Sequence, residues 1–218
     1  MHKSIATLHY LTQDVPGFSH TSQVQMACEA GIRWIQLRIK NSLYQEWLKI
    51  AEEVRMITMK FNTTLIINDN PSIAKNVEAD GVHLGRNDMS VNDARNMLGD
   101  EFIIGLSAHS LKELIESRGA SIDYVGLGPF HFTQTKNELD PVLGLQKFRE
   151  RIAEARLQGS PKPIIAIGGI KLNDVENLFN AVADGVAVSS AINLSPAPAD
   201  AMAQFIDQIK IFQNQEIL

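Results

Sequence analysis

The feature of this sequence that most constrains its fold is a regular alternation of short apolar runs with longer amphipathic segments along the whole chain. Such alternation is typical of βαβ units, in which helices cover a sheet of parallel strands. The runs that we predict as strands are Ile5 to Leu11, Arg33 to Arg38, Thr64 to Ile67, Gly81 to Leu84, Phe102 to Leu106, Tyr124 to Leu127, Pro163 to Ile167 and Val186 to Val188. These eight runs favour an α/β fold with a single (β/α)₈ barrel domain over residues 1–218, although an open doubly wound sheet shows the same alternation.

The segment between the second and third predicted strands shows how a helix would cover this sheet. An apolar stripe at helical spacing is formed by Leu43, Trp47, Ile50, Ala51, Val54 and Ile57. A stripe of this kind packs on a sheet and leaves the opposite helix face to solvent. Ser42 is predicted as the N-cap of this helix, with Gln45 completing a capping box.

Charge and cysteine content limit the classes of partner. The formal net charge of −5 argues against general nucleic-acid binding. Cys28 is the only cysteine, so no intrachain disulfide can form, and a reducing compartment fits. No apolar run is long enough to suggest a membrane span or a signal peptide. We therefore expect a cytoplasmic protein with neither nucleic-acid nor membrane partners, and the sequence leaves association into a homo-oligomer open.

Polar side chains alternate along the second predicted strand. Gln36, Arg38 and Lys40 would share the face that points into the barrel, because side chains of a strand alternate between its two faces. Cations at this position are costly unless a ligand or a counter-ion meets them. The sequence therefore predicts an anion site at the carboxyl ends of the strands. The alternative is an internal ion pair with Asp69 or Asp88.

Carboxylates follow the next two strands. Asn68 and Asp69 come directly after the third run, and Asp88 follows the fourth run and its turn. Two oxygen ligands, completed by substrate phosphates and water, are the usual way in which proteins hold Mg²⁺. The sequence therefore predicts that Asp69 and Asp88 bind magnesium. The alternatives are a turn residue before Pro71 for Asp69 and a helix cap near Ser90 for Asp88.

Two further segments suggest phosphate binding. After the sixth strand, Thr133, Thr135 and Lys136 can donate to phosphate oxygens from the long connection Pro129 to Pro141, although a solvated turn would have similar composition. After the seventh and eighth strands, glycine and hydroxyl residues are typical of the phosphate cup of many barrels: Gly168, Gly169, Ser189 and Ser190. That cup indicates the type of ligand and not the reaction. A buried structural role is favoured for His83 over general-base catalysis.

Taken together, these segments resemble thiamine-phosphate synthase, which joins a hydroxymethylpyrimidine pyrophosphate to a thiazole phosphate. The matching motifs are Q-x-R-x-K at Gln36 to Lys40, N-D at Asn68 and Asp69, D-G-V-H-L-G-x-x-D at Asp80 to Asp88, the family serine at Ser107, G-x-G-P-x-x-x-T-x-T-K at Gly126 to Lys136, and the phosphate glycines in Ile167 to Ile170. The matches run in order from residue 34 to residue 190. Two departures are Arg86, where the family often has Gln, and Ser189, where it has an apolar residue.

The resemblance implies a transferase with magnesium as cofactor and small molecules as partners. Its catalytic residues would be Arg38, Lys40, Ser107 and Lys136; its substrate-binding residues Gln36, Arg38, Lys40, Asn68, Ser107, Thr133, Thr135, Lys136, Gly169, Ser189 and Ser190; and its metal ligands Asp69 and Asp88. Pyrophosphate would leave first, and the thiazole nitrogen would then capture a stabilised carbocation without a protein nucleophile. Two other functions stay open, a thiazole tautomerase and a regulatory barrel that binds phosphate. The paired carboxylates and Lys136 favour the synthase.

Overall fold

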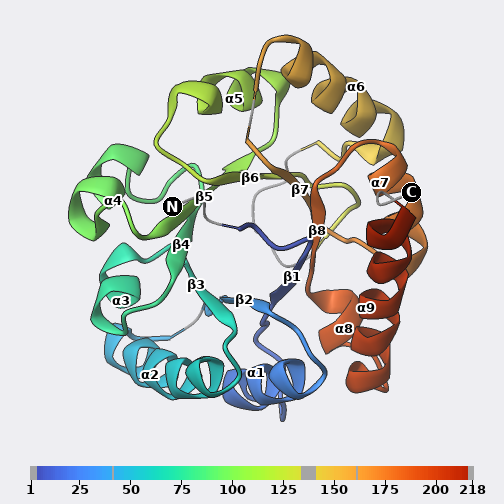
Figure 1. The fold of residues 1–218 in the computed structure, drawn as a ribbon. Coiled ribbons are helices and arrows are strands. Elements are labelled where there is room, and N and C mark those ends of the chain that lie inside the picture. Colours follow the sequence, from blue (N-terminus) through green and yellow to red (C-terminus); the bar gives the residue numbers. More distant parts are fainter. Residues whose placement is uncertain (1–3, 41, 134–140, 161, 216–218) are drawn as a thin grey trace.

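The computed structural model of the protein describes residues 4–40, 42–133, 141–160 and 162–215. Its strands form a closed parallel barrel in chain order, as Figure 1 shows along the barrel axis. The strands are β1 (Leu8–Leu11), β2 (Trp34–Leu37), β3 (Thr64–Asn68), β4 (Gly81–Leu84), β5 (Ile103–Ala108), β6 (Tyr124–Leu127), β7 (Ile164–Ile167) and β8 (Gly185–Val188). Tyr10 of β1 pairs with Ile35 of β2 on one side and with Val188 of β8 on the other, and this closure excludes the open sheet.

Helices form the outer ring of the barrel (Figure 1). They are α1 (His20–Glu29), α2 (Tyr44–Lys60), α3 (Pro71–Asn76), α4 (Val91–Leu98), α5 (Leu111–Glu116), α6 (Gly144–Leu157), α7 (Val175–Asn180), α8 (Ser190–Asn193) and α9 (Pro198–Gln215), with 3₁₀ turns at Ser117–Gly119 and Leu172–Asp174. The N-cap predicted at Ser42 is wrong. Leu43 holds that position with extended backbone and no side-chain hydrogen bond, and the helix begins at Tyr44.

The strands bury two separate apolar layers. Outward-facing residues such as Ile35 and Leu37 pack against the helices, as their alternation with Gln36 predicts. Inward-facing residues, among them Trp34 and Tyr124, fill the lower part of the barrel. A packed interior of this kind is usual for small parallel barrels, and it leaves the mouth at the carboxyl ends of the strands as the place for a ligand.

The face at the amino ends of the strands, called the lower face below, carries one arrangement three times. An aspartate directly before β4, β6 and β8 accepts the backbone N–H of the preceding odd strand and also pairs with an arginine: Asp80 with Leu65 N at 2.7 Å and Arg55, Asp123 with Ile104 N at 2.8 Å and Arg95, Asp184 with Ile164 N at 2.7 Å and Arg156. Each of these aspartates therefore links two strands and a helix. The lower face therefore stabilises the barrel.

Candidate functional site

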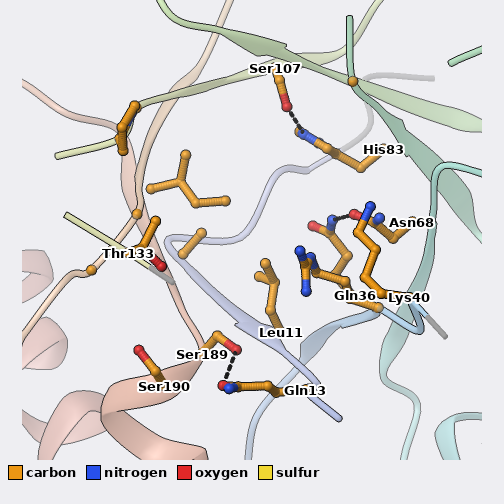
Figure 2. Close-up of a pocket in the computed structure, with 18 of the residues that line it drawn as sticks. Leu11, Gln13, Gln36, Lys40, Asn68, His83, Ser107, Thr133, Ser189 and Ser190 are labelled. Atoms are coloured by element: carbon orange, nitrogen blue, oxygen red, sulfur yellow. Dashed lines mark hydrogen bonds between the residues drawn. The ribbon is translucent and has the colours of Figure 1, made fainter. Parts of the chain in front are cut away.

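A cavity of about 900 Å³ opens at the carboxyl ends of the strands. It is lined by each residue that the sequence predicted for the site and that the structure describes: Gln36, Arg38, Lys40, Asn68, Asp69, Asp88, Ser107, Thr133, Gly169, Ser189 and Ser190. Thr135 and Lys136 lie outside the described residues. Figure 2 shows Gln36, Asn68 and Lys40 on one side of the cavity, and Thr133, Ser189 and Ser190 on the opposite side.

The side of the cavity formed by β2 and β3 carries cations and amides. Gln36 is buried on the inner face of β2, and its Nε2 donates to Asn68 Oδ1 at 2.6 Å. Because β2 ends at Leu37, Arg38 and Lys40 lie in the following loop and not on the strand, yet both line the cavity. Burial lowers the pKa of the Arg38 guanidinium, and the nearby charges of Asp69 and Asp14 oppose that shift. A half-buried cation at a cavity wall is suited to an anionic ligand.

An ion pair that the sequence allowed as an alternative is present for Lys40. Its Nζ lies 2.5 Å from Asp69 Oδ2, and both side chains are only partly buried. Exposed pairs of this kind add little to stability, so a stronger anion such as a phosphate can replace the aspartate as the partner of Lys40. The pair is therefore compatible with a binding role for both residues.

Asp69 and Asp88 lie next to each other at the mouth. Burial raises the pKa of the Asp88 carboxyl, and the charge and hydrogen bonding of Asp69 raise it further, while the Gly85 N–H and Lys40 oppose the shift. The helix-cap alternative for Asp88 is wrong, since Ser90 caps α4. Asp88 Oδ2 instead accepts the Gly85 N–H at 2.6 Å. Asp69 has a positive φ of 64° and directly precedes Asn70, the N-cap of α3, so its position is also that of a turn residue before Pro71.

This pair of carboxylates fits the small number of protein ligands that Mg²⁺ takes when phosphates complete its shell. Across the described residues there is no group of three or more His, Cys, Asp or Glu side chains that could hold a metal. A second carboxylate beside Asp69 is electrostatically costly without a cation between them. The donor set is thus hard oxygen in a like-charged pair, which suits a divalent cation better than zinc or copper.

The glycines after β7 form a seat for the loop after β6. Gly168 and Gly169 have φ values of +95° and +68°, and the His131 N–H donates to Gly168 O at 2.9 Å. A Cβ on Gly169 would lie 2.8 Å from the Cβ of His131 and 3.0 Å from the carbonyl oxygen of Phe132. Glycine is therefore required here so that the loop bearing Thr133 can sit close to the cavity, in addition to any exposure of backbone N–H groups to phosphate.

The β8 side of the cavity is held by a chain of hydrogen bonds back to β1. Ser189 Oγ donates to Gln13 Oε1 at 3.3 Å and accepts from Asn193 Nδ2 at 3.3 Å, and the Tyr10 hydroxyl donates to Asn193 Oδ1. The serine that departs from the family pattern thus has polar partners. Gln13 lines the cavity, and sequence reasoning missed it because it belongs to no motif.

His83 is buried, as the favoured structural role requires, and it also reaches the cavity wall. Its Nδ1 lies 3.0 Å from the Tyr124 hydroxyl and its Nε2 lies 3.0 Å from Ser107 Oγ. The histidine therefore joins the inner core of the barrel to a serine that the family resemblance assigns to the substrate.

The comparisons with known proteins show the family of the chain and agree with its barrel fold. A family model described as thiamine monophosphate synthase matches residues 10–192, which includes every strand of the barrel after the first residues of β1. The chain belongs to the thiamine monophosphate synthase family. The family and the enzyme class predicted from the motifs, a transferase of thiamine biosynthesis, are confirmed.

Individual members of the family match over most of their length. A thiamine-phosphate synthase of Bacteroides fragilis is 37% identical over 194 residues, which are 89% of this chain and 95% of that protein. A thiamine-phosphate synthase of Clostridium novyi is 40% identical over 176 residues, covering 81% of this chain and 84% of its own. The solved structure of a thiamine phosphate pyrophosphorylase from Pyrococcus furiosus superposes with a TM-score of 0.82 at 28% identity, covering 94% of this chain and 95% of that one. In the part of the chain that the structure describes, no helix is long and apolar enough to cross a membrane.

Proposed function

We propose that this protein is a thiamine-phosphate synthase that condenses 4-amino-2-methyl-5-hydroxymethylpyrimidine pyrophosphate with 4-methyl-5-(2-phosphoethyl)thiazole, with Mg²⁺ as cofactor. The observation that carries the proposal is that one cavity has two chemically different sides. Cations and carboxylates line the side formed by β2 to β4, and glycines and hydroxyls line the side formed by β6 to β8. Two anionic substrates that differ in charge require two such sides.

The pyrophosphate fits the side with the larger charge. Arg38 and Lys40 would bind its oxygens from the β2 side, Thr133, Thr135 and Lys136 would reach them across the cavity (Figure 2) from the loop after β6, and Asp69 and Asp88 would hold Mg²⁺. When bound, the cation neutralises charge that grows on the leaving pyrophosphate. Lys40 can exchange its contact with Asp69 for a phosphate oxygen, because a partly exposed ion pair contributes little to the stability of the fold and is therefore easily broken.

The thiazole monophosphate fits the opposite side, where Gly169, Ser189 and Ser190 offer neutral donors. Ser189 donates to Gln13 and accepts from Asn193, which fixes the side chain at the cavity wall, and its proton would turn from Gln13 to the phosphate when the ligand binds. With the two phosphate groups anchored at opposite walls, the thiazole nitrogen and the pyrimidine methylene would meet between them. Holding the reactants in line in this way is itself a large contribution to rate.

The reaction would proceed by substitution with early bond cleavage. The bond between the methylene carbon and the pyrophosphate oxygen breaks, and its electron pair leaves with the pyrophosphate. The lone pair of the thiazole nitrogen then forms the new carbon–nitrogen bond. Gln36, Asn68 and Ser107 would hold the pyrimidine, while Arg38, Lys40 and Lys136 stabilise the charge of the leaving group.

We also propose that the protein works in the cytoplasm. Its one cysteine, Cys28, is a buried free thiol with a pKa raised mainly by burial, so it is a packing residue with no disulfide partner in the chain. A chain with this cysteine usage needs no oxidising compartment. Fractionation of cells that produce the protein would test this assignment, and recovery with the membrane or the exterior fraction would contradict it.

The test of the reaction is direct. The purified protein is mixed with both substrates and Mg²⁺, and the products are followed by phosphorus NMR. Thiamine phosphate and pyrophosphate should appear in equal amounts, and neither should form when one substrate is left out. Rearrangement of the thiazole without condensation would identify a tautomerase instead. Binding of both ligands without turnover would indicate a regulatory barrel.

A further inference from the structure

A histidine and a tyrosine inside the barrel are seated by two glycines on the neighbouring strands. A Cβ on Gly105 of β5 would lie 2.5 Å from His83 Nδ1 and 2.2 Å from Tyr124 Cζ, and a Cβ on Gly126 of β6 would lie 3.2 Å from His83 Cε1. Both glycines therefore leave space that the two rings occupy. Side chains in this packed interior have little freedom to reorient, so the contacts of the His83 ring are fixed by the fold.

The partners of His83 determine which ring nitrogen carries the proton. The Tyr124 hydroxyl is buried, and among the described residues its hydrogen-bond partner is His83 Nδ1. Burial raises the pKa of this phenol, so the hydroxyl keeps its proton and donates it to Nδ1. A neutral imidazole that accepts at Nδ1 carries its own proton on Nε2. His83 Nε2 then donates to Ser107 Oγ, 3.0 Å away.

The direction of these hydrogen bonds, from Tyr124 to His83 and from His83 to Ser107, determines the role of Ser107. Its Oγ accepts the hydrogen bond from His83 Nε2–H, so its own O–H is left to donate, and the side chain lies at the cavity wall, as Figure 2 shows. In hydrolases with a catalytic triad the histidine accepts the serine proton and makes the serine a nucleophile. The order here is the reverse. We propose that Tyr124 and His83 are positioning residues that hold Ser107 as a hydrogen-bond donor to an acceptor atom of the bound pyrimidine pyrophosphate, an inference that rests on the proposed function.

His9 shows what a purely structural histidine looks like in the same interior. It is fully buried, stacks on Trp34 with ring centroids 4.3 Å apart, and its Nε2 has no hydrogen-bond partner among the described residues. Burial, followed by the nearby His83, lowers the pKa of His9 to about 3. This residue is neutral and fills space. His83 differs because both of its ring nitrogens meet hydroxyl groups and one of those hydroxyls faces the cavity.

A double-mutant cycle distinguishes positioning from simple packing. Tyr124→Phe removes only the buried hydroxyl, and it should lower kcat by about 5- to 10-fold, as loss of one buried hydrogen bond does. Ser107→Ala should lower kcat by about 10²-fold, the usual effect of losing one oriented donor. If Tyr124 acts through Ser107, adding Tyr124→Phe to Ser107→Ala should change kcat by less than about twofold. A further loss of about 5- to 10-fold in the double variant would overturn the proposal.

Tyr10→Phe is the matched control. Tyr10 is also buried in the barrel wall, and its hydroxyl bonds to Asn193 on the far side of the cavity. Its effect on kcat/KM should multiply with that of Ser107→Ala, because no shared partner links the two. A conservative variant gives a second comparison. His83→Gln keeps a donor near the position of Nε2 and should retain more kcat than His83→Leu, and the two should be equal in the Ser107→Ala background.

A measurement without turnover tests the hydrogen bonds from Tyr124 through His83 to Ser107 independently of the reaction. Nitrogen-15 NMR of the histidine rings distinguishes a protonated from an unprotonated ring nitrogen. In the unaltered protein at neutral pH, His83 should carry its proton on Nε2, and Tyr124→Phe should produce a mixture of both tautomers. A proton on Nδ1 in the unaltered protein would overturn the inference, whatever the activity. If the tautomer is as expected but no thiamine phosphate forms from the two substrates, the proposed function fails and Ser107 loses the acceptor that this inference assigns to it.

Discussion

The two ends of this barrel are built in opposite ways. At the lower face, Asp80, Asp123 and Asp184 repeat one arrangement, in which a carboxylate takes the N–H of a neighbouring strand and pairs with an arginine. At the mouth, Asp88 lies beside a second carboxylate, Asp69, and burial together with this neighbour raises the pKa of Asp88. The three aspartates of the lower face are paired with arginines, whereas Asp69 and Asp88 place two like charges side by side, where we propose that a metal ion binds. The comparison teaches that stability and function occupy different ends of the same strands.

The largest effect should follow from removing the metal that the mouth is proposed to hold. Excess chelator should lower kcat by at least about 10³-fold, because growing negative charge on the leaving pyrophosphate would lose its divalent partner. Readdition of Mg²⁺ should restore turnover, measured as release of pyrophosphate. Full turnover in chelator would show that Asp69 and Asp88 have a role other than metal binding.

A smaller loss should follow from removing the lysine of the loop after β6. Lys136→Ala should lower kcat by about 10²-fold, since a donor that strengthens its contact in the transition state contributes to kcat as well as to kcat/KM. Lys136 lies outside the described residues, so this prediction rests on its motif. Lys147→Ala, on the exposed face of α6, is the control and should have no effect. If Lys136→Ala left kcat unchanged and altered only the KM for the thiazole phosphate, the two anion sites would be assigned the wrong way round.

Substitution of Gly169, which lies against the loop after β6, should lower kcat/KM by about tenfold. Gly169→Ala forces a Cβ against His131 and the Phe132 carbonyl, which displaces the loop that carries Thr133, so both substrates should be affected. Gly99→Ala is the control for positive φ without crowding, because Gly99 has a φ of +83° and a Cβ there meets no atom within 4 Å. Both variants should lose stability, measured by thermal unfolding, and only Gly169→Ala should lose activity. Equal activity in the two variants would contradict the claim that Gly169 lets the loop bearing Thr133 lie close to the cavity.

The smallest predicted effect concerns stability and pH at Asp88. Its carboxyl has a raised pKa in the folded state, so the unfolded chain releases this proton first as the pH rises, and the ionised group lowers the free energy of unfolding. In metal-free protein at about pH 7, Asp88→Asn should therefore raise Tm, and the gain should disappear below the ordinary aspartate value of about pH 4. Thermal unfolding across this range checks the sign. A lower Tm for the variant at neutral pH would mean that Asp88 stabilises the fold.

Much of the barrel could be predicted because its signal is local and periodic. The alternation that places Ile35 and Leu37 outside and Gln36 inside follows from the pleat of a single strand, and the structure has it so. Element ends were less predictable. The first strand begins at Leu8 and not at Ile5, and the second helix begins at Tyr44 and has no cap at Ser42. These ends depend on neighbouring elements that the local sequence does not describe.

The candidate site likewise contains residues that the sequence could predict and residues that it could not. Residues within motifs could be named in advance, because the chemistry of each motif is contained in a few consecutive positions. Gln13 could not, since its contact with Ser189 spans 176 positions and exists only because β1 closes on β8. The link from Tyr124 through His83 to Ser107 likewise joins three strands. The first contact comes from the closure of β1 on β8 and the second from the pairing of β5 with β4 and β6, and neither leaves a local pattern in the sequence.

The most direct test of this division compares the same substitution at the two ends of neighbouring strands. Asp69→Asn at the mouth should lower kcat by at least about 10²-fold and change Tm by less than about 2 °C, because the asparagine tolerates the positive φ of this residue and the lost ion pair is partly exposed. Asp80→Asn at the lower face should lower Tm by about 3–6 °C with kcat unchanged within about twofold, because Asp80 both accepts the Leu65 N–H and pairs with Arg55, and loss of the charge at both contacts costs about 1.5 kcal/mol. Measuring Tm and kcat for both variants should give this crossed pattern. A variant pair in which Asp80→Asn loses turnover without losing stability, or Asp69→Asn unfolds without losing turnover, would contradict the separation of function from stability.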